Sequence, residues 1–188
     1  QIEKAAALGY TMNLGMEAEF FVFRDEEGVP NPVSPQAHLD KPAYDTSRLL
    51  DNIGWLQELV DAMNDLGWDV YSFAHEAGIG QVEIAFAYAD VRTMADRFVL
   101  LRMMANKIAE RHGAHASFMP KPYGERTGSG AHFNMSLAGT DGTNLFKDPN
   151  DPRGCGLSTL GYQFLAGILK HLPAIMATYA KVNPGASN

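Results

Sequence analysis

The chain has 188 residues, of which 46% are hydrophobic and 20% are charged, a composition typical of a packed globular protein that excludes intrinsic disorder. It carries 15 Lys and Arg against 22 Asp and Glu, a net charge of −7, without any basic run, so we expect no nucleic-acid partner. No apolar stretch approaches the roughly 18–20 residues that span a bilayer, and we expect no membrane partner. The single cysteine, Cys155, excludes an internal disulfide framework and favours a reducing, cytoplasmic location.

The first half of the chain predicts a helix end, a strand, a helix and a strand pair. Residues 1–8 are Ala-rich and precede Gly9, which is typical of a helix terminus. Residues 11–23 predict a strand, followed by a Pro-rich connection up to Asp45 that carries a function or contains a hairpin. Ser47 is expected to cap a helix that runs to about Leu66 and stops at Gly67. Two strands, 68–76 and 81–88, follow around the turn at 77–80.

The second half predicts a helix, two strands and a last helix. The first of these helices begins at Asp90 and stops at Gly113. Residues 115–119 and 131–137 predict strands around a loop rich in Gly and Pro, and a helix from Ser158 should kink or restart at Pro173. The sequence therefore predicts an α+β fold with a mostly antiparallel sheet and helices on one face. Residues 1–188 are expected to form a single domain that starts inside a longer natural chain.

Three of the predicted strands share one pattern of alternation, because successive side chains point to opposite faces of a sheet. In each strand one face is apolar, and the other carries acids, amides or a histidine. The apolar sets are Met16, Ala18, Phe20 and Val22; Val82, Ile84 and Phe86; and Phe133, Met135 and Leu137. The polar sets are Glu17 and Glu19, about 7 Å apart along the strand; Gln81 and Glu83, with His75 and Glu76 across the turn; and His132, Asn134 and Ser136.

Each polar set taken alone is more often an ordinary solvated sheet face or a structural histidine. If the sets converge, however, four carboxylates would repel one another strongly unless a cation lies among them. Oxygen-rich ligation favours Mg²⁺ or Mn²⁺, whereas the lack of a cysteine cluster or a spaced histidine pair argues against zinc. The number of carboxylates suggests two ions, an arrangement typical of phosphoryl transfer.

A loop at residues 118–130 precedes His132 and contains Lys121, Arg126 and a Gly-Ser-Gly sequence. Its glycines would let backbone amides approach a ligand, and its two cations could meet a phosphate or a carboxylate. A surface hairpin loop is the simpler alternative, because neither a Walker A nor a dinucleotide-binding motif is present.

Four motifs occur in the order seen in glutamine synthetases, and the resemblance covers residues 12–172. They are GMEAEFF at 15–21, HEAGIGQVEI at 75–84, FMPKP at 118–122 and GSGAHFNMSL at 128–137. The chain most resembles the bacterial type III branch, which is close to γ-glutamylmethylamide synthetases. The resemblance implies that residues 1–188 form a partial catalytic domain, which contains part of the glutamine synthetase/guanido kinase-like core.

By this resemblance the activity would be ATP-dependent conversion of glutamate and ammonia to glutamine through a γ-glutamyl phosphate, with two or more Mg²⁺ or Mn²⁺ ions. The implied metal ligands are Glu19, Glu76 and Glu83 for one ion and Glu17 and His132 for the other. The implied glutamate contacts are Gly128, His132 and Gln81. The implied nucleotide contacts are Ser136, Asn134, Tyr88 and Lys121. No catalytic residue is assigned beyond the metal ligands.

The chain also departs from the family pattern at some positions, with Thr127 where Asn is common and Ala131 where Met is common. The family's small N-terminal domain, its phosphate-binding arginines and a further metal carboxylate lie outside the sequence, so we expect the 188 residues alone to be inactive. The resemblance implies a homo-oligomeric ring, a dodecamer, in the full-length protein. Two alternatives are a synthetase of γ-glutamylmethylamide or another γ-glutamyl amine, and a non-catalytic structural or regulatory relative.

Overall fold

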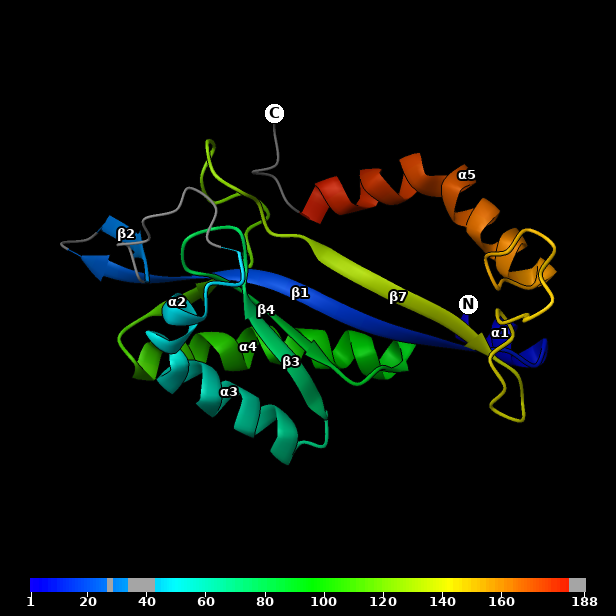
Figure 1. Cartoon of the computed structure of the whole chain (residues 1–188), viewed down its shortest axis with the longest axis horizontal. Helices are drawn as coiled ribbons and strands as arrows, with labels where there is room; N and C mark the ends of the chain where they lie inside the picture. The colour runs from blue at the N-terminus through cyan, green and yellow to red at the C-terminus, as the bar shows by residue number, and fades with distance from the viewer. Residues whose placement is uncertain (27–28, 34–42, 183–188) are drawn as a thin grey trace.

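A computed structural model describes residues 1–26, 29–33 and 43–182 of the chain. The elements in chain order are α1 (Ile2–Ala7), β1 (Thr11–Glu26), β2 (Val29–Pro32), α2 (Thr46–Leu50), α3 (Ile53–Asp65), β3 (Val70–His75), β4 (Gln81–Phe86), β5 (Ala89–Asp90), α4 (Val91–Arg111), β6 (His115–Ser117), β7 (Ala131–Ala138) and α5 (Thr159–Val182). Figure 1 shows β1 as the long central strand, with α3 and α4 together beside it. The described helices include none that is both long and apolar enough to cross a bilayer.

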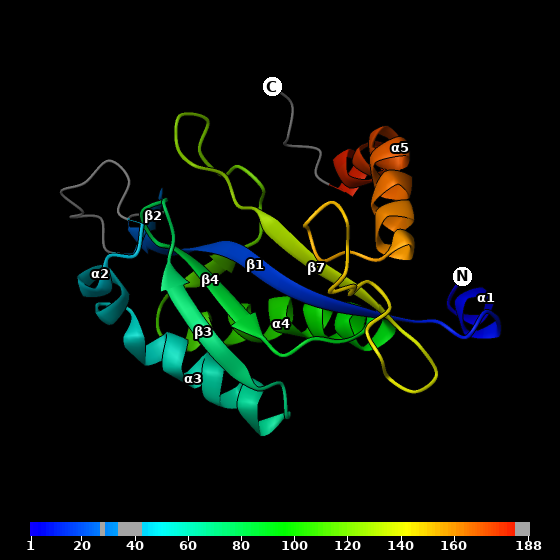
Figure 2. The same cartoon turned by 45° about the vertical axis from the view of Figure 1, so that its right-hand side comes forward.

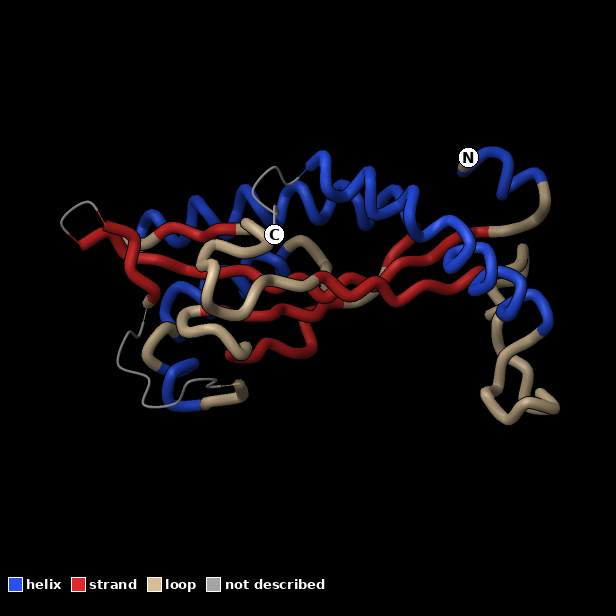
Figure 3. Tube along the Cα trace, turned by 90° about the horizontal axis from the view of Figure 1, so that it is seen from above, coloured by secondary structure: helices blue, strands red, loops and turns tan. Residues whose placement is uncertain are grey.

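The sheet is organised around β1, which pairs with five other strands, and all the pairings are antiparallel. Strands β4 and β7 lie on opposite edges of β1, since Glu17 pairs with Ala85 on one side and with His132 on the other. Strand β3 adds to the free edge of β4. In Figure 3 the strands run lengthwise as one elongated layer. The prediction of a mostly antiparallel sheet is therefore confirmed.

The core lies between one face of this sheet and helices α3 and α4 (Figure 2). The apolar face of β1 is buried as predicted, and Phe20 is fully enclosed beside Trp55 and Phe118. Helix α4 contributes Met94 and Leu101 to this core, and both side chains are fully buried. Helix α5 lies away from α3 and α4, on the far side of β7 (Figures 1 and 2).

The helix predicted from Ser47 to Leu66 is divided in two, and its cap was wrongly assigned. Asp45 is the N-cap of α2, because its Oδ1 accepts hydrogen bonds from the backbone amides of Ser47 at 2.9 Å and Arg48 at 3.4 Å. The side chain of Asn52 donates to the Arg48 carbonyl at 3.1 Å, which satisfies an end of α2 before α3 begins. Gly67 does follow the second helix, with a φ of 72°.

Three other local predictions can be compared with the structure. The Pro-rich connection contains a hairpin, since β2 pairs with the end of β1, whereas residues 34–42 lie outside the described part of the chain. Strands β6 and β7 flank the Gly/Pro loop as predicted, and each pairs with β1. Helix α5 does not restart at Pro173 but continues through it to Val182, so of the two predicted outcomes only a kink remains.

Candidate active site

The polar face of β1 and its neighbours forms one acidic surface opposite the core. Glu19 pairs with Glu83 across to β4, and Glu17 pairs with His132 across to β7. Directly paired residues of an antiparallel sheet project from the same face. The sheet register therefore places these four side chains on one face, as the alternation in the sequence predicted.

Three of these side chains approach closely enough to share one ion. One ligand atom each of Glu17, Glu83 and His132 lies within 4.8 Å of the other two. The Nδ1 atom of His132 lies 3.2 Å from Oε2 of Glu17, and the Nδ2 atom of Asn134 donates to Oε1 of Glu17 at 2.9 Å. Asn134 thus contacts a candidate metal ligand, in addition to facing the groove described below.

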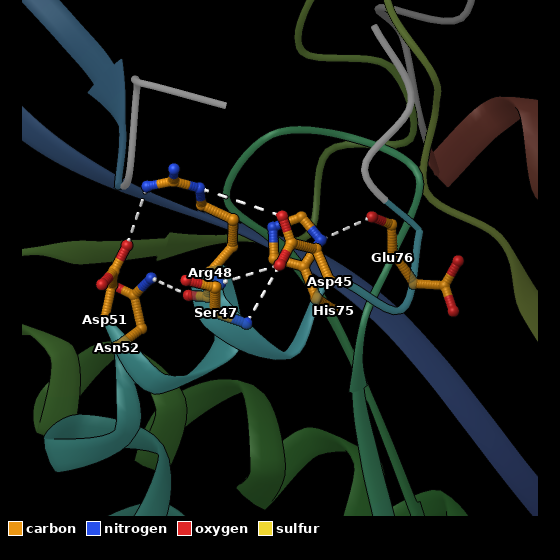
Figure 4. A network of polar contacts seen from close by, with 7 residues as sticks. All are labelled: Asp45, Ser47, Arg48, Asp51, Asn52, His75 and Glu76. Atoms are coloured by element: carbon orange, nitrogen blue, oxygen red, sulfur yellow. Dashed lines mark hydrogen bonds and ion pairs between the residues drawn. The ribbon is translucent and has the colours of Figure 1, made fainter. Parts of the chain in front are cut away.

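Glu76 directly follows β3, and its backbone carbonyl is hydrogen-bonded to the buried ring of His75, the last residue of that strand. The ring of His75 is 2% exposed, and its Nδ1–H donates to the Glu76 carbonyl oxygen at 2.7 Å. Figure 4 shows this contact beside the capping network of α2, with the Glu76 carboxylate pointing away from the network. His75 lies beside a turn, a place typical of surface residues, but it is buried, and Leu49 and Phe73 line the same small cavity as its ring.

The carboxylates of the acidic surface influence one another electrostatically. Burial raises the pKa of Glu76 above its usual value, and the negative charge of Glu19 raises it further. Burial likewise raises the pKa of Glu83, followed by the charges of Glu76, Glu17 and Glu19. Neighbouring negative charges therefore disfavour the ionised forms of Glu76 and Glu83, which is the situation that a cation relieves.

Glu19 is not part of the cluster of Glu17, Glu83 and His132. Its carboxylate instead accepts hydrogen bonds from two other segments of the chain. Its Oε2 accepts from Nε2 of Gln81 at 2.8 Å and from the backbone amide of Gly130 at 2.9 Å. Gln81 was expected to contact the substrate, but its side chain is fully buried and its amide bonds to Glu19, to Gly128 and to Gly78. The structure thus offers no exposed part of Gln81 to a ligand.

The loop 118–130 is folded back on itself next to Glu19. The backbone amide of Ser129 donates to the Pro120 carbonyl at 2.7 Å, and a Cβ on Gly128 would lie 2.6 Å from that same oxygen. Any residue other than glycine at position 128 would therefore require the loop backbone to move. Of the two cations, Arg126 lies over the ring of Tyr123 at 4.7 Å, and Lys121 is exposed.

A groove of about 640 Å³ extends from Glu17 along β1 and β7. Among its lining residues are three of the expected nucleotide contacts, namely Tyr88, Asn134 and Ser136; the fourth, Lys121, does not line it. Sequence reasoning missed Asn13 and Tyr71, which line the same groove. Asn13 could have been found from its period-two spacing to Glu17, whereas the bulge between Val70 and Ser72 concealed the direction of Tyr71.

Comparison with known proteins agrees with this geometry. A family model for the glutamine synthetase catalytic domain matches residues 1–184. The chain belongs to the glutamine synthetase catalytic-domain family. Among similar curated proteins, the glutamate–methylamine ligase of Methyloversatilis universalis is 41% identical over 94% of this chain, and the glutamine synthetase of Clostridium saccharobutylicum is 40% identical over 96%.

Solved structures of this family share the fold. Apo GmaS superposes with a TM-score of 0.84 at 36% identity over 91% of this chain, and Plasmodium falciparum glutamine synthetase with 0.75 at 26% identity over 94%. These matches cover 39% of each of those chains, and the chain spans 40% and 41% of the two curated relatives. The described glutamine synthetase core therefore corresponds to about two fifths of the proteins it matches.

The donors of this glutamine synthetase core fit hard divalent cations. Four carboxylates and one imidazole suit Mg²⁺ or Mn²⁺, which prefer oxygen ligands and tolerate a histidine. The raised pKa values of Glu76 and Glu83 are consistent with this use, because a bound cation would offset the repulsion that produces them.

Proposed function

We propose that the full-length protein is an ATP-dependent ligase that joins the side-chain carboxylate of glutamate to ammonia and forms glutamine. One observation carries the proposal: three carboxylates and a histidine share the polar face of the sheet, with the charge of Glu19 acting on a fourth carboxylate, Glu76, and an open groove lies directly beside them. A site that transfers a phosphoryl group needs both features, a cation-binding cluster and room for a polyphosphate. Membership of the glutamine synthetase family supports the same reaction.

In this proposal, Glu19, Glu76 and Glu83 hold one divalent ion and Glu17 and His132 hold the second. When bound, the ions neutralise charge on the phosphates of ATP and on the carboxylate that accepts the phosphoryl group. The carboxylate oxygen of glutamate bonds to the γ-phosphorus as ADP leaves. The ammonia nitrogen then attacks the acyl carbon, the bond between that carbon and the phosphate oxygen breaks, and the proton lost by nitrogen leaves with the inorganic phosphate.

The remaining residues position the two substrates. Tyr88 and Ser136 line the groove, where an exposed aromatic ring can cover the base and a hydroxyl can donate to the nucleotide. Asn134 holds Glu17 through its amide hydrogen bond. In this proposal Gly128 and His132 contact glutamate, and Lys121, which is exposed on the same loop as Gly128, contacts the phosphates of ATP.

The test is ADP release by the full-length protein with Mg²⁺ or Mn²⁺. The proposal requires that release depend on glutamate and ammonia together and yield one glutamine per ADP. A non-catalytic relative would release none, although it would be expected to have lost part of the carboxylate set that this chain retains. We expect the 188-residue polypeptide to bind Mn²⁺ weakly and to release no ADP, since the family resemblance assigns phosphate-binding arginines to other parts of the protein.

A second candidate acceptor is methylamine, which would yield γ-glutamylmethylamide. It is supported by the 41% identity to a glutamate–methylamine ligase and by the TM-score of 0.84 with GmaS, against 0.75 with the Plasmodium falciparum glutamine synthetase. Comparing kcat/KM for ammonia with that for methylamine in the full-length protein decides between the two. A ratio well above one assigns glutamine formation, and a ratio well below one assigns the methylamide.

We also propose that the full-length protein is a cytoplasmic homo-oligomeric ring, a dodecamer, as in the family it belongs to. Exposed apolar side chains support an assembly, among them Val99 and Met103 on α4 and Leu169 and Met176 on α5. Light scattering after size-exclusion chromatography measures the subunit number. A monomer at micromolar concentration would contradict the ring.

A further inference from the structure

The side chain of Gln81 joins three segments that are distant in the sequence. It lies at the start of β4, and none of its surface is exposed. Its Oε1 accepts from the backbone amide of Gly78 at 2.8 Å, and its Nε2 donates to Oε2 of Glu19 at 2.8 Å and to the Gly128 carbonyl at 3.1 Å. One carboxamide therefore bonds the turn after Glu76, a carboxylate of the acidic surface and the loop 118–130.

The surroundings of this carboxamide leave little freedom for another arrangement. A Cβ on Gly78 would lie 2.7 Å from Oε1 of Gln81 and 2.7 Å from the ring of Phe21. A Cβ on Gly130 would lie 3.1 Å from Oε1 of Glu19, whose other oxygen accepts from the Gly130 amide. The backbone at Gly78 thus lies close to the side chain of Gln81, and the backbone at Gly130 lies close to that of Glu19. A larger residue at either glycine would have to displace its neighbour, so these two side chains have little room to move.

The chemistry of this joint requires an amide. Gln81 supplies an acceptor to one backbone amide and two donors to a carboxylate and a carbonyl, which glutamate at this position could not do in its ionised form. A carboxylate there would also stand 2.8 Å from Glu19, where like charges repel. Without the donor, Glu19 would keep only the Gly130 amide as a partner, and the charges of Glu76 and Glu83 would push it aside.

We propose that Gln81 is a positioning residue that ties the orientation of Glu19 to the position of the loop at Gly128. The proposal rests on the proposed ligase function, in which Glu19 is a metal ligand and the loop contacts glutamate. Gln81 acts through these two groups, because no part of it is exposed to a substrate. Partners that orient a metal ligand in this way are worth roughly 10- to 100-fold in metal affinity or activity.

The experiment replaces Gln81 by Met in the full-length protein, which preserves the length of the side chain and removes its hydrogen bonds. Mn²⁺ affinity is measured from the electron paramagnetic resonance signal of free Mn²⁺, and KM is measured separately for glutamate and for ATP. Opening of the loop is followed by tryptic cleavage after Arg126, which is exposed. We expect Mn²⁺ affinity to fall and the KM of glutamate to rise by about 10-fold each, with faster cleavage. The KM for ATP should rise less than that of glutamate, because Lys121 is the only expected nucleotide contact on the loop.

Two controls separate positioning from stability. Gln57→Met makes the same chemical change on the exposed side of α3, where Nε2 donates to Asp61 at 2.8 Å, and should change none of the four readouts. Leu59→Ala removes a fully buried core side chain and should lower the melting temperature while Mn²⁺ affinity of the folded protein stays unchanged. Should Gln81→Met fail to fold, Gln81→Asn, which is one methylene too short to reach all partners, is expected to give the same pattern.

Unchanged Mn²⁺ affinity in either folded variant would overturn the proposal, and so would weaker Mn²⁺ binding with an unchanged rate of cleavage after Arg126. If the wild-type protein releases no ADP with glutamate and ammonia, the ligase function fails by itself. The Mn²⁺ titration and the proteolysis do not need turnover, so they still decide whether Gln81 couples Glu19 to the loop.

Discussion

The two faces of β1 are built by different forces although they alternate residue by residue along one strand. On one face, Met16, Ala18, Phe20 and Val22 are buried against helices and aromatic rings, and their stability comes from the removal of apolar surface from water. On the other face, Glu17 and Glu19 are held by hydrogen bonds from a histidine, two side-chain amides and a backbone amide. The apolar face therefore stabilises the fold. The acidic face lowers the stability somewhat, because it holds carboxylates close together where a ligand can bind.

The largest expected effect lies on the apolar face. Phe20→Ala removes a fully buried ring that stacks on Phe118 at 4.7 Å and meets Trp55 edge-on at 6.2 Å. We expect a loss of about 3–5 kcal/mol in the free energy of unfolding, from lost transfer energy and the cavity left behind. Urea denaturation of the 188-residue chain measures it.

The matched control is Phe133→Ala, whose ring is 45% exposed in the same sheet. It should cost about 1 kcal/mol or less, because little apolar surface is uncovered. Equal losses for the two variants would mean that the buried face does not dominate stability.

The next effect lies on the acidic face and concerns activity. Glu19→Ala in the full-length protein should lower ligase activity by more than about 100-fold, since it removes a proposed ligand rather than one of its partners. Its melting temperature should change little, because no core contact is lost. The control Glu58→Ala removes a carboxylate that pairs with His112 on the outside of the helices, and near-normal turnover is expected. Normal turnover of Glu19→Ala would show that Glu19 is not a ligand of a metal ion that the reaction needs.

The period-two alternation made both faces of β1 predictable from the sequence, because backbone geometry alone decides which side chains share a face. On β7 the same alternation did not predict burial, since Phe133 and Met135 of its apolar set are exposed and only Leu137 is buried. What could not be predicted depends on three-dimensional neighbours. Gln81 looks like another polar residue of its strand, and only the approach of Gly78 and Gly128 reveals that its amide is fully engaged. His75 sits beside a turn in the sequence, yet α2 and its preceding residues cover it in the fold.

A smaller effect on stability is expected at the N-cap of α2, where the sequence suggested Ser47 and the structure has Asp45. Asp45→Ala removes the side chain that accepts from the Ser47 and Arg48 amides, and should cost about 1 kcal/mol in the free energy of unfolding. Ser47→Ala should cost only a few tenths of that, since its side chain is exposed and does not cap the helix. Thermal unfolding of the two variants side by side measures the difference. The reverse order would restore Ser47 as the cap.

The smallest effect is a gain of stability on the acidic face. The pKa of Glu83 is raised, first by burial and then by Glu76, Glu17 and Glu19, so its ionised form is disfavoured in the folded chain. A carboxyl with a raised folded-state pKa contributes stability below its ordinary pKa of about 4.3, and loses that contribution as the pH rises through the folded-state value. Glu83→Gln should therefore stabilise the metal-free chain at pH 7 by about 0.5 kcal/mol, since repulsion at a partly exposed site is screened.

The gain from Glu83→Gln should vanish near pH 4, where the wild-type carboxyl is protonated. At pH 7 the gain should be reversed by Mn²⁺, because Mn²⁺ stabilises the wild-type protein, which keeps the carboxylate ligand, more than the variant. Glu110→Gln on the exposed side of α4 gives the control, with no gain at pH 7, because Glu110 pairs with Lys107 rather than with other acids. A gain that persisted at pH 4 would trace to packing around residue 83 instead of charge. Reversal by Mn²⁺ would show that the acidic face, unlike the apolar one, reaches its full stability only with its ligand bound.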